Sequence, residues 1–138
     1  MKIKSLMLVA CGLLFLPLLG MAQNTVQPTN YTSKVKNAGF LAAVIETTDD
    51  LIASETKNFG EIQIVFCGKN IHQLTDVAMM NPILKKIKGK PITIIACGFS
   101  LNKFKVDPKF VPKEVVVVDN GILHQFQLLK KGYLSLDL

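Results

Sequence analysis

Three short runs of mostly apolar, β-branched residues, separated by segments of helical periodicity, set the strongest limit on how this chain can fold. The runs are residues 61–66 (EIQIVF), 91–96 (PITIIA) and 115–118 (VVVV). Runs of this length and composition are typical of strands buried on both faces of a sheet. We expect a further half-exposed strand at the C-terminus, where Leu134, Leu136 and Leu138 alternate with other residues.

Helical periodicity connects these runs. Apolar residues recur at separations of three and four over 38–57, 71–78 and 81–87, and a last helix capped by Asn120 has a stripe of Ile122, Phe126 and Leu129. Strands that alternate with helices indicate a parallel sheet covered by helices. The sequence therefore predicts a three-layer α/β/α domain with a mostly parallel sheet of about four to five strands.

The first 22 residues have the pattern of a secretory signal peptide. A basic start precedes the apolar run 6–19, and Gly20 and Ala22 are small residues at the positions that a signal peptidase requires. Pro17 interrupts a run already shorter than the roughly 20 apolar residues of a membrane span. We expect cleavage after Ala22, no stable membrane span, and a periplasmic or secreted protein. A lipoprotein modified at Cys11, which ends a lipobox-like stretch, is the alternative.

The remaining residues divide into two segments. Residues 23–37 are polar and include a proline, which predicts a flexible N-terminal lead, with a short strand around 31–35 as its alternative ending. Residues 38–138 are of the right length for one α/β domain.

Composition excludes several functions. The formal net charge is +6, yet every basic residue is lysine, and the chain has no tryptophan and two tyrosines. Without arginine forks or stacking aromatics, nucleic acid is not an expected partner. Metal-ligand spacing, a phosphate-binding glycine loop and a serine elbow are also missing, so we expect no metal and no cofactor.

Two consecutive strands end in the same dipeptide, Cys67-Gly68 and Cys97-Gly98. The carboxyl edge of a parallel sheet is where such domains bind ligands. A thiol at this edge, followed by a glycine and by helix amides, is placed to be stabilised as a thiolate. Because Ser100 is expected to begin a helical turn directly after it, Cys97 is the better candidate for a reactive residue. Both cysteines also suit a buried core position or a disulfide with each other.

Two histidines are secondary candidates. His124, in the first turns of the last helix, and His72, five residues after Cys67, are each candidates to line a site and exchange a proton with a thiol. A solvated or packed role is the ordinary alternative for both.

The segment 92–138 resembles the C-terminal half of the DsrE/DsrF-like sulfur-relay family. The resemblance lies in an ordered series of residues: Cys97, Gly98, Asp107, Pro108, 115–118, Gly121, Leu128, Gly132 and Tyr133. It implies a three-layer α/β/α fold, assembly into trimers or hexamers, and a cysteine that receives and passes on sulfur as a persulfide.

The leading hypothesis from the sequence is an exported sulfur-handling protein, a sulfurtransferase or sulfur carrier, with the persulfide on Cys97. It would exchange sulfur with a donor or acceptor protein. The alternatives are a non-catalytic oligomeric binding module of the same fold, and a redox protein that uses Cys67 and Cys97 as a dithiol.

Overall fold

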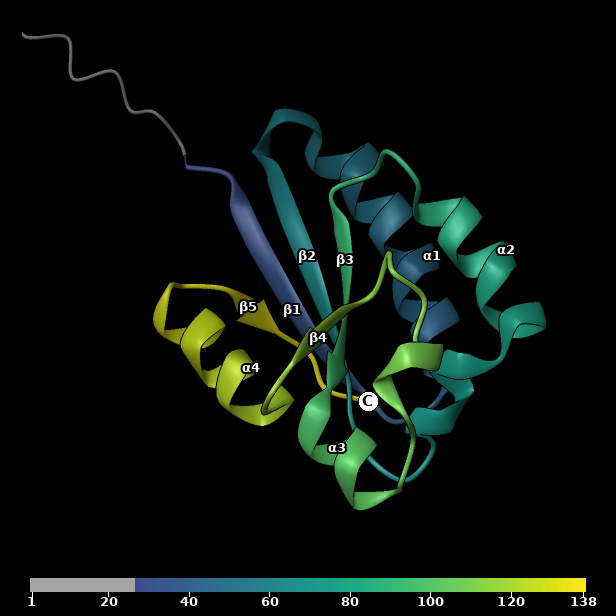
Figure 1. Ribbon diagram of the computed structural model, residues 1–138. Helices are drawn as coiled ribbons and strands as arrows, with labels where there is room; N and C mark the ends of the chain where they lie inside the picture. Colours follow the sequence, from purple (N-terminus) through teal and green to yellow (C-terminus); the bar gives the residue numbers. More distant parts are fainter. Residues whose placement is uncertain (1–26) are drawn as a thin grey trace, which may run out of the picture.

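A five-stranded parallel sheet forms the centre of the molecule, described here from a computed structural model that covers residues 27–138 (Figure 1). The predicted signal peptide and the lipobox cysteine lie outside the described residues. The spatial order of the strands is β4-β3-β2-β1-β5, and every neighbouring pair is parallel. The strands are β1 (Thr29–Val35), β2 (Phe59–Phe66), β3 (Ile92–Cys97), β4 (Val116–Val118) and β5 (Leu134–Ser135).

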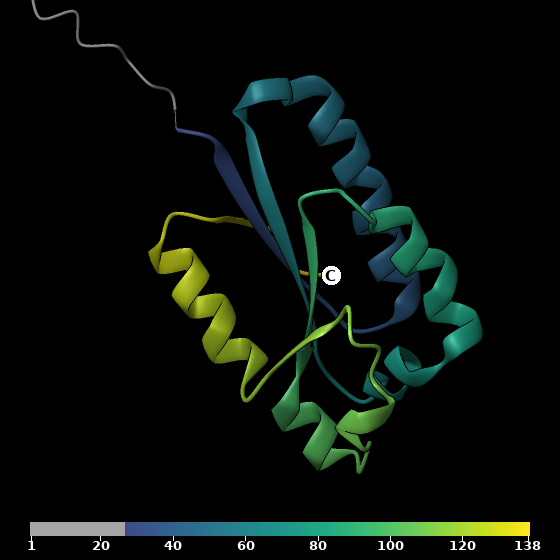
Figure 2. The ribbon, with the colours of Figure 1, turned by 45° about the horizontal axis from the view of Figure 1, so that its top comes forward.

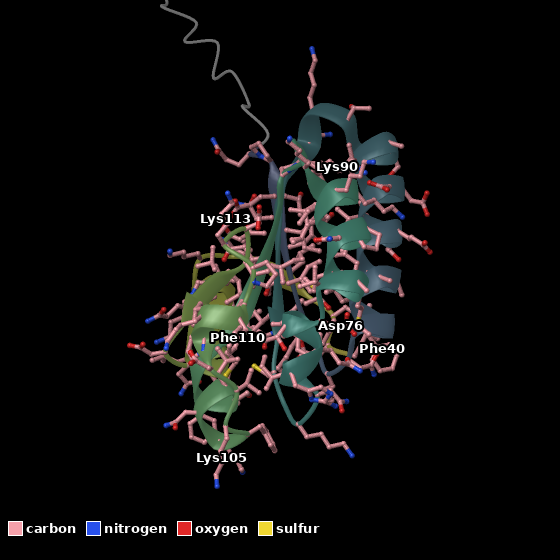
Figure 3. The ribbon with its side chains drawn as sticks, turned by 45° about the vertical axis from the view of Figure 1, so that its right-hand side comes forward. Phe40, Asp76, Lys90, Lys105, Phe110 and Lys113 are labelled. Carbon is pink, nitrogen blue, oxygen red and sulfur yellow. The ribbon has the colours of Figure 1, made fainter. Side chains whose placement is uncertain are left out.

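Helices cover both faces of this sheet, which confirms the predicted three-layer architecture. On one face lie α1 (Ala38–Glu55) and α2 (Val77–Ile87), and on the other lies α4 (Gly121–Lys130) (Figures 1 and 2). The short helix α3 (Gly98–Lys103) continues from β3 at the carboxyl end of the sheet. Figure 3 shows Lys90, before β3, and Lys105, after α3, at opposite ends of the molecule. Within residues 27–138, no helix is long and apolar enough to cross a bilayer.

The alternation of side chains along β2 and β3 divides the core in two. Ile64 and Ile94 belong to the large cluster under α1 and α2. Val65 and Ile95, one position further along, belong to a smaller cluster that also contains Cys67 and Cys97, with Val118 packed against it. Because successive residues of a strand point to opposite faces, the period of the strands alone places both thiols on the α4 face.

The prediction of a flexible lead is wrong for residues 29–35. These residues form β1 (Thr29–Val35), an interior strand between β2 and β5. The domain therefore begins near residue 29 rather than at 38. The buried polar residues of β1 are accommodated by hydrogen bonds: Thr32 Oγ1 donates to the Gln63 carbonyl at 3.0 Å, and Ser33 Oγ donates to the Leu136 carbonyl at 2.6 Å. A strand that buries hydroxyls in this way has no apolar signature in the sequence.

Two further predictions are corrected in detail. The valine run 115–118 is not buried throughout, because β4 is an edge strand that leaves Val116 and Val117 more than two-fifths exposed. The helix expected to restart at residue 81 begins earlier, where the Asp76 side chain accepts from the Met79 amide at 3.1 Å. Pro82 consequently lies inside α2, and residues 71–75 form a 3-10 helix.

Candidate functional site

Cys67 and Cys97 lie side by side at the carboxyl edge of the sheet. The register pairs Phe66 of β2 with Ala96 of β3, so Cys67 and Cys97 are the next pair across the two strands. Both thiols are free and buried, and each shifts the pKa of the other. The sheet therefore brings together the two residues that the sequence singled out.

The Cys97 sulfur accepts a hydrogen bond from the backbone of α4: the Gly121 amide donates to Cys97 Sγ at 3.3 Å. The hydroxyl and the amide of Ser100 lower the pKa of Cys97. The Gly68 amide donates to Ser100 Oγ at 3.0 Å, which leaves the hydroxyl proton of Ser100 available for an acceptor. These donors suit an anion at this position.

The first turn of α4 explains why the Gly121 amide is free to serve Cys97. Asn120 caps the helix, and its Oδ1 accepts from the amides of Ile122 and Leu123 at 3.0 and 3.1 Å. The amide of His124 donates to the Asn120 carbonyl. The first amides of a helix need partners from outside the helix, and for Gly121 that partner is the thiol.

Ser100 has a different role from the predicted one. The helix begins at Gly98, with Cys97 itself at the capping position and no side-chain cap. Ser100 lies inside α3, is buried, and connects the Gly68 amide to Cys97. The residue belongs to the site, but as a hydrogen-bonding link and not as a helix cap.

The pKa values of the two thiols are driven in opposite directions. Burial alone would raise the pKa of Cys97, but the hydrogen bonds from Ser100, Gly121 and Cys67 outweigh it and lower the pKa. Burial, the hydrogen bond to Cys97 and the charge on Cys97 raise the pKa of Cys67 to about 12. Cys97 is thus the more acidic thiol of the pair, and Cys67 stays protonated at neutral pH.

A cavity of about 260 Å³ opens onto this pair. Both cysteines, Gly68 and Ser100 line it, and its remaining lining consists of lysines and exposed apolar side chains: Lys34, Lys36, Lys103, Phe99, Phe104 and Ile122. Lys34 is neutralised by Asp137 at 2.6 Å, whereas neither Lys36 nor Lys103 forms an ion pair among residues 27–138. The opening therefore favours a small anion.

Two glycines allow the backbone to close tightly around the thiols. A Cβ on Gly121 would lie 2.8 Å from Val65 Cγ1 and 2.9 Å from both Cys67 Sγ and Cys97 Cβ. A Cβ on Gly98 would lie 2.7 Å from the Val118 carbonyl oxygen. Because Gly98 has no side chain, the connection between β4 and α4 can pack against the start of α3. Gly98 does not line the cavity.

The histidine candidates do not reach the thiols. His124 Nε2 lies 2.8 Å from Gln63 Oε1, and the residue is not part of the cavity lining. Burial, followed by the charge of Lys131, lowers the pKa of His124. His72 is exposed in the 3-10 helix, with Nδ1 3.4 Å from the Lys69 carbonyl. Proton transfer at the site is therefore left to Ser100 and Cys67.

Several residues of the site have no signal in the sequence. Lys34 and Lys36 reach the opening because β1 lies beside β2, an arrangement that local sequence does not encode. Gly121 is recognisable as the residue after the cap Asn120 and as a member of the resemblance, but no local signal places its amide at Cys97. Within the described part of the chain, no three acidic, histidine or cysteine side chains gather as a metal site requires.

The class of protein defined by fold and site is a parallel α/β domain with a paired-cysteine pocket at the carboxyl edge of its sheet. No family model and no curated protein matches the chain. Among solved structures it is similar to the protein of unknown function MTH1491 from Methanobacterium thermoautotrophicum. The TM-score is 0.69 with 15% sequence identity, over 80% of this chain and 99% of that one. At this identity the similarity shows the fold alone.

Proposed function

We propose that the protein is an exported sulfur carrier that holds sulfane sulfur as a persulfide on Cys97. The observation that carries the proposal is the position of Cys97 at an open cavity, where its Sγ accepts from the Gly121 amide at 3.3 Å and its pKa is lowered. A thiolate, and not a thiol, is the attacking species in sulfur exchange.

The proposed transfer needs no added oxidant or reductant. The Cys97 thiolate attacks the sulfane sulfur of an anionic donor, a sulfur–sulfur bond forms on Cys97, and the remainder of the donor leaves with the electron pair of the broken bond. An acceptor thiolate then takes the outer sulfur, and Cys97 departs again as a thiolate. Lys36 and Lys103 at the opening favour donors that carry negative charge, such as thiosulfate or inorganic polysulfide.

Intact-mass measurement of the mature protein tests this function. Incubation with polysulfide should add about 32 Da, the mass of one sulfur atom, and reductant should remove it. Cys97→Ser should abolish the gain, whereas Cys67→Ser, which keeps a hydroxyl donor beside Cys97, should retain it. If neither the wild-type protein nor Cys67→Ser gains mass from polysulfide or thiosulfate, the proposal is overturned.

Selective alkylation provides a second test of the same site. At limiting iodoacetamide and neutral pH, peptide mapping should find Cys97 labelled before Cys67, because the pKa of Cys97 is lowered and that of Cys67 is raised to about 12. If Cys67 reacts first, or if Cys97 reacts only after unfolding, Cys97 is a core residue and does not carry sulfur.

Membership in the DsrE/DsrF-like family is part of this proposal. Its support is the ordered series of matching residues from Cys97 to Tyr133, together with the α/β/α fold. One residue of that series, Gly121, has a physical reason to be glycine, because a side chain at this position would clash with both cysteines.

Self-assembly into a trimer or hexamer is also proposed. The predicted stripe of α4 faces outward: Phe126 is 58% exposed, and Ile122, Leu123 and Leu129 are also exposed, close to the exposed edge strand β4. The helix instead buries Gly121, Gln125 and Leu128. An apolar face of this kind is typical of a contact between protein chains. Light scattering should give a trimer or larger, and a monomer at micromolar concentration would contradict it.

Export completes the proposal and has its own test. Mass analysis of protein secreted or released from the periplasm should give an N-terminus at Gln23. A lipid on Cys11 would contradict this and support the lipoprotein alternative.

A further inference from the structure

We propose that Cys67 is the resolving thiol of this site: it attacks the inner sulfur of a Cys97 persulfide, releases hydrogen sulfide and closes a Cys67–Cys97 disulfide. The inference rests on the proposed persulfide and assigns to the same site a reductive outcome, so that the protein both carries sulfur and liberates it as sulfide.

The sheet geometry places Cys67 and Cys97 close enough to form a disulfide. Cys67 and Cys97 follow the paired residues Phe66 and Ala96 on adjacent parallel strands. Such strands are about 4.8 Å apart, and cysteines whose Cα atoms are about 4.4 to 6.8 Å apart can form a disulfide. Both side chains belong to the small cluster on the α4 face. One point, the position of a Cβ on Gly121, lies 2.9 Å from both Cys67 Sγ and Cys97 Cβ.

The environment of Cys67 favours attack by this thiol after Cys97 has accepted sulfur rather than before. Burial raises the pKa of Cys67, and the neighbouring Cys97 raises it further through hydrogen bonding and charge. Loading of Cys97 moves the negative charge to the outer sulfur, about 2 Å further away. The part of the shift that comes from Cys97 is then weakened, so that Cys67 is a better nucleophile after sulfur has been accepted than before.

The step balances without another reactant. Cys67–SH and Cys97–S–S⁻ give Cys67–S–S–Cys97 and HS⁻: the bond between the inner and outer sulfurs of the persulfide breaks, and the bond between the two cysteine sulfurs forms. The proton of Cys67 leaves with the outer sulfur, which is reduced to sulfide while the two cysteine sulfurs are oxidised. A dithiol reductant reopens the disulfide by two thiol–disulfide exchanges.

The cavity provides the exit for the product. Both cysteines line the same opening as Lys36 and Lys103. Positive charge at the rim stabilises sulfide as it leaves in the anionic form.

The experiment loads the mature protein with inorganic polysulfide, removes the excess without oxygen, and follows intact mass and released sulfide with time. Wild-type protein should lose its gain of about 32 Da and finish about 2 Da below the reduced mass, with about one sulfide per chain. Peptide mapping should find the Cys67–Cys97 disulfide. In Cys67→Ser the persulfide should decay at least about tenfold more slowly. Reduced protein that was never loaded, kept under the same anaerobic conditions, should keep its mass.

The outcomes separate the two proposals. A wild-type persulfide that persists as long as that of Cys67→Ser overturns the resolving role and leaves the carrier function standing. Failure of both proteins to load overturns the carrier function and this inference with it. The wild-type mass and the peptide map decide the question even if the variant folds poorly.

Discussion

The substitution Gly121→Ala tests the closest contact in the site. In a helix, alanine in place of glycine ordinarily stabilises a protein by about 0.4–1 kcal/mol, since the unfolded chain loses freedom. Here the new methyl would lie within 3.0 Å of Val65, Cys67 and Cys97, all buried on strands or at their ends. Overpacking of a tight core costs about 1–3 kcal/mol. We therefore expect Gly121→Ala to lower the free energy of unfolding by about 1–2 kcal/mol.

The same substitution should change the chemistry of Cys97. To relieve the contacts, the start of α4 must move away from the sheet, which lengthens the 3.3 Å hydrogen bond from the Gly121 amide. The pKa of Cys97 should then rise, and its alkylation rate at neutral pH should fall severalfold, because a hydrogen bond to a charged group has been weakened.

Urea denaturation and iodoacetamide kinetics across a pH series measure the two effects. Gln127→Ala, an exposed position on the same helix, is the control for helix propensity and should leave both unchanged. If Gly121→Ala is as stable as wild type or more stable, with an unaltered pH profile, the close approach of α4 to the thiols is refuted.

Three further predictions concern other parts of the structure. Ser100→Ala should lower the free energy of unfolding by about 0.5–1.5 kcal/mol, because the half-buried Gly68 amide loses its hydrogen-bond acceptor, and should raise the pKa of Cys97; urea denaturation and the alkylation profile measure these effects. Phe126→Glu places charge on the exposed face of α4 and should reduce the assembly seen by light scattering while leaving the circular dichroism spectrum intact. Burial lowers the pKa of His124 from its ordinary value of 6.5, so the unfolded chain binds the proton more readily than the folded one. Stability from this residue should be complete above about pH 6.5 and be lost as the pH falls below it; His124→Gln should abolish that part of the pH dependence in urea midpoints, and an unchanged slope would contradict the assignment.

The fold was predictable where local sequence has one dominant signal. The runs that contain Val65 and Ile95 are too short and too apolar for anything but interior strands, and Asn120 caps its helix as predicted. Strand β1 was indicated only as a short strand around 31–35 that ends a flexible lead. Its signal is weak because Thr32 and Ser33 are polar, and their burial depends on carbonyls contributed by β2 and by the C-terminal segment.

The stripe on α4 shows a second limit of sequence patterns. Ile122, Phe126 and Leu129 were recognised as one face of a helix, but periodicity does not say whether that face meets the sheet. The sheet takes the neighbouring face because Gly121 fits against the cysteines and Gln125 donates to Asp137 at 2.6 Å. Close packing and a buried hydrogen bond thus turn the apolar stripe toward solvent.

The position of Cys67 and Cys97 at the ends of parallel strands could be predicted from the sequence, because strand period and strand length are local properties. Three features are known only from the tertiary structure: the two strands are neighbours in register, the Gly121 amide donates to Cys97, and Lys36 lines the opening. Those contacts join residues more than 20 positions apart in the chain, and they depend on strand order and helix docking. The two candidate thiols could therefore be predicted from the sequence, whereas their proximity and the opposite shifts of their pKa values arise from packing.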